Sequence, residues 1–332
     1  MLDIRIKAKN VSPLCQIDSN QKERHKNLGM EIDTATIKTL TKIYEGYPVD
    51  IPIITAGDRR GNLRRVIGAL MIMAYKNKGY EIKPTDFHLM MSGGGSNFQS
   101  QPFEIEEKAR ELNPLISLMG TSLAIEGKLI VTHLEPIDPM IKIYETEDGF
   151  YARSQLIRKF VFIKKDDILQ HTEYGRLLNK KDIEEWEKEV SESQNLRKKE
   201  RKILDESKTK KQAIQSILAK YYIIPNTEFR GNIDTKYELT ELEYGALIKG
   251  LIEMTKKQVG STKNLGFGVM DWDIKIGESE IKAVSNEENI FKKEMDIYLD
   301  DKEQKALKKF EEFLENISPE NIEISKILIS KS

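Results

Sequence analysis

The sequence predicts an α+β fold of the ferredoxin-like class, interrupted by long insertions. Segments with strand and helix character follow one another in the order strand, helix, central strands, helix, strand, which is the order of a split β-α-β unit. The chain has 332 residues, of which 39% are hydrophobic, so it contains enough apolar side chains for a real core. Charged residues make up another 32%, and they dominate the stretches that interrupt this order.

The first third of the chain predicts a strand, a loop and a helix. Residues 2–9 alternate between apolar and polar side chains, as a half-buried strand does, and the polar face is mostly basic. Residues 10–41 are polar and irregular, which predicts a long functional loop. A short apolar run at 51–54 leads into a helix in which apolar residues recur at helical spacing from Leu63 onward. Asp58 is the expected N-cap of this helix.

The middle of the chain predicts a glycine-rich loop, a helix and several strands. Residues 92–102 hold three consecutive glycines and form a loop between two halves of the fold. Residues 104–120 have the pattern of an amphipathic helix, and strands are predicted at 127–134, 141–144 and 160–163.

The chain changes character between residues 179 and 220, where polar helix formers predict a long charged helix or helical pair. After residue 220, the sequence predicts a strand near 227–229, a helix over 241–257 and a strand over 267–276. The domain organisation expected from these patterns is a palm with inserted loops at 1–178 and 221–277, a charged helical insertion at 179–220, and an acidic helical C-terminal tail at 278–332.

Charge and cysteine content exclude several classes of protein. The formal net charge is −1, with residues 278–332 contributing −5 and residues 1–277 contributing +4, so the chain before the tail is only weakly basic and any phosphate contact depends on local clusters of cations. No apolar run approaches the roughly 20 residues that span a bilayer, and the N-terminus has no signal-type segment, so we expect a cytoplasmic protein without membrane contact. Cys15 is the single cysteine, which excludes an intrachain disulfide and a Cys/His zinc site. We expect no metal and no cofactor.

The most informative segment runs from Gly57 to Arg65 and places four arginines within seven residues where a strand turns into a helix. A helix N-terminus offers unpaired N–H groups, and arginine adds bidentate donors, so this combination suits a phosphate. The alternative is a solvated helix start whose arginines pair with acidic neighbours.

A second candidate segment runs from Gly260 to Gly268, preceded by Lys256 and Lys257. It is not a Walker loop, because no glycine-lysine-Ser/Thr triplet opens a helix here. Its glycines allow close backbone approach to a polyanion, and Ser261 to Asn264 supply donors. The alternative is an ordinary glycine-rich turn.

Other candidate patterns point to binding and not to catalysis. The glycines at 93–95 lack the spacing and the strand-to-helix context of a dinucleotide site. Phe98 lies in a polar loop, where an aromatic ring is available to stack on a base. The sequence contains no nucleophile-elbow motif, and Asp18 and Asp33 are isolated carboxylates. We therefore predict no catalytic residues.

Three motifs resemble landmarks of the repeat-associated RAMP superfamily. The first is the strand, small-residue turn and arginine-rich helix start from Ile51 to Arg65; the others are Thr227-Glu-Phe-Arg-Gly231 and the loop ending at Gly268. Together they cover most of the chain and resemble the backbone subunit of multisubunit CRISPR effector complexes. The segments around Ser12-Pro13-Leu14, the triple glycine and 112–120 are most similar to the type IV version, with the type I-D and type III versions as close competitors.

This resemblance implies an RRM-like, RNA-binding palm that oligomerises head to tail along a guide RNA, with an inserted thumb hairpin that displaces a guide base at intervals. The implied partners are the guide crRNA, a target DNA or RNA, copies of the chain itself and other CRISPR effector subunits. The RNA-binding residues expected from the motifs and the resemblance are Arg59, Arg60, Asn62, Arg64, Arg65, Gly93, Gly94, Gly95, Asn97, Phe98, Arg230, Lys256, Lys257, Gly260, Ser261, Thr262, Lys263 and Asn264.

Two other functions remain open at this point. One is a target-RNA endonuclease of the type III kind, in which a loop aspartate cuts RNA; Asp18 and Asp33 lie in the corresponding region, but neither sits in a recognisable version of that motif. The other is a protein scaffold that contacts its partners through residues 179–220 and does not touch RNA.

Overall fold

The computed structural model describes residues 2–27, 30–94, 102–122, 125–147, 149–165 and 215–329. The chain forms two compact units. The first consists of Met1–Gln21, Ala35–Arg158 and Tyr221–Ser332, and the second of Lys22–Thr34 and Lys159–Lys220. All of the sites discussed below lie in the first unit.

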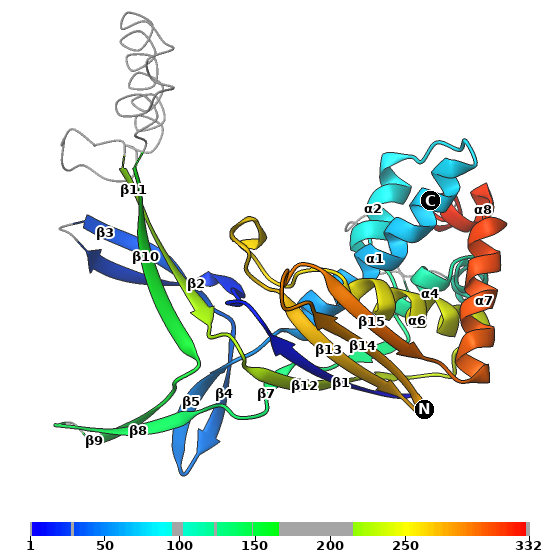
Figure 1. Cartoon of the computed structure of the whole chain (residues 1–332). Coiled ribbons are helices and arrows are strands. Elements are labelled where there is room, and N and C mark those ends of the chain that lie inside the picture. The colour runs from blue at the N-terminus through cyan, green and yellow to red at the C-terminus, as the bar shows by residue number, and fades with distance from the viewer. Residues whose placement is uncertain are drawn as a thin grey trace, which may run out of the picture. The chain divides into compact units, whose positions relative to one another are not determined.

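The centre of the first unit is an antiparallel sheet with the strand order β13-β1-β12-β6. Figure 1 labels three of these strands, β13, β1 and β12. Helix α1 follows β1 in the chain, and helix α6 connects β12 to β13. In chain order the strands are therefore the fourth, first, third and second of a β-α-β-β-α-β unit, which confirms the predicted α+β ferredoxin-like fold. The bounds are β1 Asp3–Asn10, α1 Ala56–Asn77, β6 Leu129–Val131, β12 Glu228–Thr235, α6 Glu241–Thr255 and β13 Met270–Ile276.

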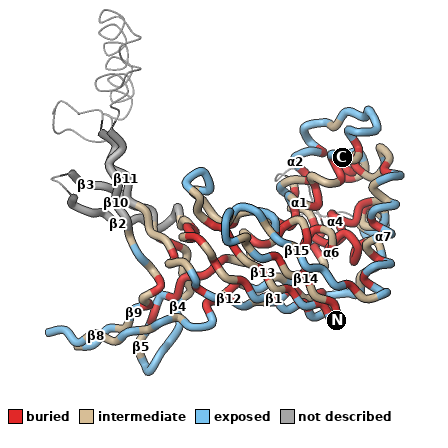
Figure 2. The backbone as a smooth tube through the Cα atoms, viewed as in Figure 1, coloured by how far each residue is buried: buried red, intermediate tan, exposed pale blue. Residues whose placement is uncertain are grey.

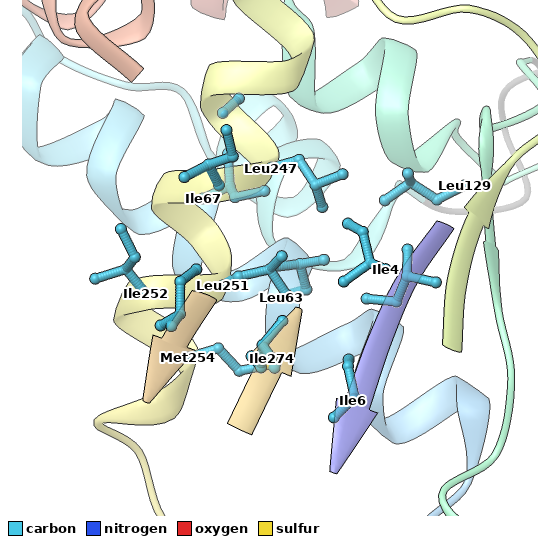
Figure 3. Packing of buried hydrophobic residues seen from close by; sticks show 14 of the residues in the cluster. Ile4, Ile6, Leu63, Ile67, Leu129, Leu247, Leu251, Ile252, Met254 and Ile274 are labelled. Atoms are coloured by element: carbon cyan, nitrogen blue, oxygen red, sulfur yellow. The ribbon is translucent and has the colours of Figure 1, made fainter. Parts of the chain in front are cut away.

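The core lies between this sheet and the two helices. Figure 3 shows Ile4 and Ile6 of β1 packed with Leu63 of α1 and with side chains of α6, all of them buried. The helices approach closely at Gly250, where a Cβ atom would lie 2.6 Å from Cγ1 of Ile67. A side chain at this position would force α6 away from α1.

The C-terminal segment extends the sheet instead of forming a helical tail from residue 278. Strands β14 (Ser279–Ser285) and β15 (Lys293–Tyr298) pair next to β13, and helix α7 (Asp301–Glu315) follows. The inward positions of β14 are small or apolar, and Ile281 and Ala283 are fully buried, which explains why this stretch is a strand. Helix α7 packs on α6, where the Cβ of a substituted Gly245 would lie 1.9 Å from the Ala306 carbonyl oxygen.

A set of shorter helices surrounds a second, smaller apolar cluster that includes Leu89, Ala109 and Ile116. The predicted helix at 104–120 is divided, because the side chain of Asn113 caps a new helix by accepting a hydrogen bond of 3.0 Å from the Ile116 N–H group. The bounds are α2 Pro84–Ser92, α3 Phe103–Leu112, α4 Pro114–Met119, α8 Pro319–Ile322 and α9 Ser325–Ile329. None of the helices in the described part of the chain is long and apolar enough to cross a membrane.

The insertions are mainly β-hairpins. The predicted loop at 10–41 contains two strands and the start of a third, because pairing between polar segments needs no apolar alternation that the sequence would reveal. In the predicted helical insertion at 179–220, residues 215–220 belong to a strand, and residues 179–214 lie outside the described residues. The hairpins pair β2 (Ile17–Asn27) with β3 (Met30–Ile37), β4 (Thr39–Tyr44) with β5 (Tyr47–Pro52), β8 (Ile141–Thr146) with β9 (Gly149–Ser154), and β10 (Ile157–Lys165) with β11 (Gln215–Ile223); the short β7 (Glu135–Pro136) pairs with β12.

Burial follows this organisation. The sheet strands alternate between buried and exposed positions, whereas the ends of the β4–β5 and β8–β9 hairpins are exposed (Figure 2). Side chains at the β4–β5 turn, such as Ile43, therefore contribute little to the core.

Candidate nucleic-acid interface

The start of helix α1 is capped from within the protein. Thr55 is the N-cap, and its hydroxyl accepts a hydrogen bond from the Asp58 N–H group at 3.2 Å, so the prediction of Asp58 as N-cap is wrong. The Ala56 N–H group donates to Nδ1 of His133 at 2.9 Å, and Lys38 pairs with the Asp58 carboxylate at 3.1 Å. Because this turn already holds a carboxylate, binding of an anion near α1 depends on the arginine side chains.

Arg60 and Arg64 lie one helical turn apart and point to the chain around α4. Arg64 is 7% exposed and donates to the carbonyl oxygens of Leu89, Met119 and Gly120 at 3.3, 2.8 and 2.7 Å. Arg60 also donates to Met119, at 2.7 Å. Desolvation, with a smaller effect from the charge of Arg60, lowers the pKa of Arg64 to about 10.

These bonds correct the role predicted for Arg64. Its guanidinium donates to three carbonyl oxygens at the ends of two helices, where the helix itself supplies few donors. The structure therefore gives Arg64 a mainly structural role in the first unit. Arg60 shares that function but is only partly buried.

Arg59 has a different environment, although it is adjacent to Arg60 in the sequence. It is 3% exposed, and its Nη1 donates to the Thr132 carbonyl oxygen at 2.6 Å. Its Nε and Nη2 atoms are buried and have no hydrogen-bond partner among the described residues. Burial lowers the pKa of Arg59 to about 10, which shows how far this guanidinium is removed from water.

The Arg59 side chain contributes to a groove of about 440 Å³, called groove 1 below. Groove 1 runs between one face of α1, the C-terminal end of α6 and the loop that follows it, with β13 contributing Trp272. Its polar and charged residues are Arg59, Asn62, Arg65, Glu253, Lys257, Gln258 and Lys263, and its apolar residues are Ile54, Val66, Ala69, Leu70, Met73, Met254, Val259 and Trp272.

Groove 1 brings together the two segments that the sequence singled out. Arg59, Asn62 and Arg65 come from the first segment, and Lys257 and Lys263 come from the second, almost two hundred residues later. Desolvation and then the charges of Arg65 and Lys257 lower the pKa of Lys263. The three cations thus repel one another in the protein alone, and an anion between them would relieve this repulsion.

The acidic and polar residues that also line groove 1 do not neutralise its three cations. Glu253 also lines groove 1, but its carboxylate pairs with Lys256 at 2.7 Å. Asn62 accepts a hydrogen bond of 2.7 Å from Nη2 of Arg65, which fixes the direction of that side chain. Lys256 therefore neutralises an acidic group at the edge of groove 1.

The loop after α6 is held by its backbone. The Ser261 N–H group donates to the Cys15 carbonyl oxygen at 2.8 Å, and a Cβ atom on Gly260 would lie 2.4 Å from the same oxygen. Gly260 and Ser261 therefore anchor the loop, and the phosphate contact predicted for them stays a prediction. Thr262 has a φ of +64°, an unfavourable conformation for a β-branched residue, and Asn264 is exposed. Backbone strain of this kind is concentrated at functional loops.

A second, smaller depression lies on the other side of Arg65 and has a volume of about 340 Å³. It is lined by Arg60, Arg64, Gly93 and residues of the 119–122 turn. Gly93 has a φ of +92° and ends α2, and Gly94 accepts a hydrogen bond of 3.0 Å from the Ser122 hydroxyl. The other predicted contacts of this loop, Gly95, Asn97 and Phe98, lie outside the described residues.

Arg230 is not part of either depression. It alternates along β12 with the buried Phe229, so its side chain points to the face of the sheet away from α1 and α6. There it lies opposite Lys7 of β1 and Glu135 of β7. The next residue, Gly231, has to be a small residue in the predicted motif Thr227–Gly231. A Cβ atom at this position would lie 3.0 Å from Nη1 of Arg59.

Sequence reasoning missed the apolar part of groove 1. Val66, Leu70 and Met73 continue the face of α1 that begins at Arg59, and helical spacing alone assigns such residues to a core. Met73 is nevertheless 62% exposed, and Trp272 is buried with an Nε1 atom that has no partner among the described residues. No sequence pattern could have indicated that Nε1 of Trp272 has no hydrogen-bond partner among the described residues.

The described residues contain no group of three or more His, Cys, Asp or Glu side chains arranged to hold a metal ion. Asp18 lies in β2, and the side chain of Asp33 is outside the described set.

No protein-family model matches the sequence, and no curated protein matches it. Similar chains occur among solved structures. One belongs to a "Type IV-B CRISPR Complex", with 14% identity and a TM-score of 0.49, and the match covers 83% of this chain and 91% of that chain. Another belongs to the "Cryo-EM structure of the Type III-B Cmr-beta bound to cognate target RNA", with 12% identity and a TM-score of 0.38, covering 83% of this chain and 60% of that one.

Proposed function

We propose that the chain is a guide-RNA-binding backbone subunit of a CRISPR ribonucleoprotein complex, which oligomerises along the guide and presents it for pairing with a target nucleic acid. The observation that carries this proposal is the convergence of Arg65, Lys257 and Lys263 on groove 1. The ferredoxin-like sheet and the sequence resemblance to RAMP-superfamily backbone subunits support the same function.

The chemistry of groove 1 fits a nucleic-acid backbone. Lysine and arginine side chains contact phosphates without reading sequence, and such contacts position a strand. The three cations lie beside one another on separate elements, so a strand that passes over groove 1 meets them in succession. Sequence recognition is then left to base pairing between guide and target.

Binding of single-stranded RNA at different salt concentrations tests the proposal. In the variant Arg65→Ala/Lys257→Ala/Lys263→Ala, the slope of log K against log salt should fall by about 2, since each phosphate contact on a single strand contributes about 0.7. The control is Lys76→Ala/Lys308→Ala/Lys309→Ala, which removes the same charge from exposed positions on α1 and α7. Equal slopes for the two variants would contradict the assignment of RNA to groove 1.

The proposed role is non-catalytic. Incubation of the assembled complex with matching RNA and a divalent metal tests this point. Regular cuts that disappear on replacement of Asp18 or Asp33 would favour the endonuclease instead. Copurified nucleic acid, seen as a raised ratio of absorbance at 260 and 280 nm, would argue against a scaffold that binds no RNA.

A further inference from the structure

Groove 1 contains more hydrogen-bond donors than a phosphate site at its rim requires. Three buried donor atoms have no partner among the described residues: Nε and Nη2 of Arg59 and Nε1 of Trp272. Both side chains are 3% exposed, and both line groove 1. Since buried polar groups are normally hydrogen-bonded, these atoms indicate a ligand that supplies acceptors.

The free donors of Arg59 have a defined geometry. Its Nη1 is held by the Thr132 carbonyl oxygen at 2.6 Å, so the guanidinium plane is fixed. The remaining Nε and Nη2 atoms form one edge of that plane, with two donors side by side. Such an edge binds two adjacent acceptors on one planar group.

The surroundings of this edge favour a base over a phosphate. Val66, Leu70, Met254 and Val259 line the same groove and are apolar, so a strongly hydrated phosphate would lose water there on every side except the one that faces Arg59 and Trp272. A planar base would instead cover these side chains. The phosphate of the same nucleotide is better placed at the rim cations Arg65, Lys257 and Lys263.

We propose that groove 1 holds one unstacked nucleotide of the bound RNA, with its base against Arg59 and Trp272 and its phosphate at the rim. This inference rests on the proposed RNA binding and deepens it. Guanine presents O6 and N7 as adjacent acceptors, and cytosine presents O2 and N3. Adenine and uracil have no such pair, so groove 1 prefers guanine or cytosine at one position of an otherwise unselected strand.

The full-length protein carrying Trp186→Phe tests the proposal, because Trp272 is then its only tryptophan. The probes are a nine-nucleotide oligo(A) and the same strand with a central guanosine, cytidine, uridine or abasic ribose. A central guanosine or cytidine should quench or shift Trp272 emission and tighten binding by about 10-fold, within the range of one good bidentate contact. Uridine and the abasic ribose should bind no more tightly than oligo(A).

Two variants separate base recognition from phosphate binding. Arg59→Lys keeps the charge but removes the two-donor edge, so it should abolish the preference for a central guanosine or cytidine over oligo(A). Trp272→Phe keeps the ring shape and removes Nε1, so it should reduce the preference only in part, as measured by fluorescence anisotropy of labelled RNA. If either variant fails to fold, the probe series on the Trp186→Phe protein decides alone.

The alternative outcomes overturn the inference in distinguishable ways. Equal, salt-dependent binding of all five strands without a change in Trp272 emission would reject the base site and leave the proposed function standing. Abasic RNA that binds as tightly as the guanosine strand would assign Arg59 to a phosphate. Free GMP that binds as tightly as RNA would make the ligand a mononucleotide, and no binding of any strand would reject the proposed function as well.

Discussion

The two faces of helix α1 use the same residue type for different purposes. On one face, Arg60 and Arg64 donate to backbone carbonyl oxygens around α4. On the other face, Arg59 and Arg65 line a groove together with lysines from a distant loop. An arginine-rich helix start is therefore not a single phosphate site, because neighbouring arginines project about 100° apart around the helix and meet different surroundings.

The largest expected effect is a loss of stability, and it tests the face of α1 that carries Arg60 and Arg64. Arg64→Ala should lower the free energy of unfolding by about 3 kcal/mol, because the Gly120 carbonyl oxygen loses its Arg64 donor and the carbonyl oxygens of Met119 and Leu89 each lose one of two donors. Arg65→Ala, on an exposed residue of the same helix, should change it by less than about 0.5 kcal/mol. Urea denaturation at constant m-value measures both, and equal losses would remove the distinction between the two faces.

The next effect concerns the turn beside Arg64. Gly93 has a φ of +92° at the end of α2, so Gly93→Ala should cost about 1–2 kcal/mol of stability through backbone strain. The added Cβ would stand 3.4 Å from the Arg64 guanidinium carbon, which is an ordinary contact. Thermal unfolding measures the loss, and an unchanged melting temperature would show that this turn relaxes without cost.

A smaller expected effect is a change of RNA affinity with pH, which tests the face of α1 that lines groove 1. Desolvation and the charges of Arg65 and Lys257 lower the pKa of Lys263, so this side chain loses its proton at a lower pH than an ordinary lysine. Because RNA attracts only the charged form, binding of RNA should weaken a few-fold on the alkaline side before other lysines titrate. Lys263→Arg should remove this early weakening. Affinities measured from pH 7 to 10 compare the two proteins, and identical profiles would argue against Lys263 as a contact.

The smallest expected effect is a gain in stability. Gly57 lies in the first turn of α1 with open space around its missing side chain, so Gly57→Ala should raise the free energy of unfolding by about 0.5 kcal/mol through helix propensity. RNA affinity should stay the same, because Gly57 does not line groove 1. A loss of affinity at constant stability would place the RNA directly on this first turn.

The elements that the sequence predicted well are those with strong periodicity. Strand β1 alternates over eight residues and helices α1 and α6 repeat apolar positions, so their type and order were predictable and the ferredoxin-like order followed. The hairpin at β2 and β3 was missed because its polar residues carry no period. The strands β14 and β15 were missed because helical spacing further along was extended over the whole C-terminal segment.

The candidate site was predictable in composition but not in geometry. The sequence indicated both basic segments, and the structure joins Arg65, Lys257 and Lys263 in one groove. It did not indicate that Arg64 would be buried under carbonyl oxygens, or that Arg230 would point to the opposite face of the sheet. Such assignments depend on the direction of each side chain after packing.

The sequence by itself determined the local properties of this protein: strand and helix periods, the positions of glycines at turns, and two clusters of cations. These follow from the backbone and from near neighbours in the chain. Only the tertiary structure decided which cations meet, because the contact between α1 and the loop after α6 exists only when both helices pack on one sheet face. Burial then leaves Arg59 and Trp272 with donors that have no partner among the described residues, a property of the assembled groove that neither segment possesses alone.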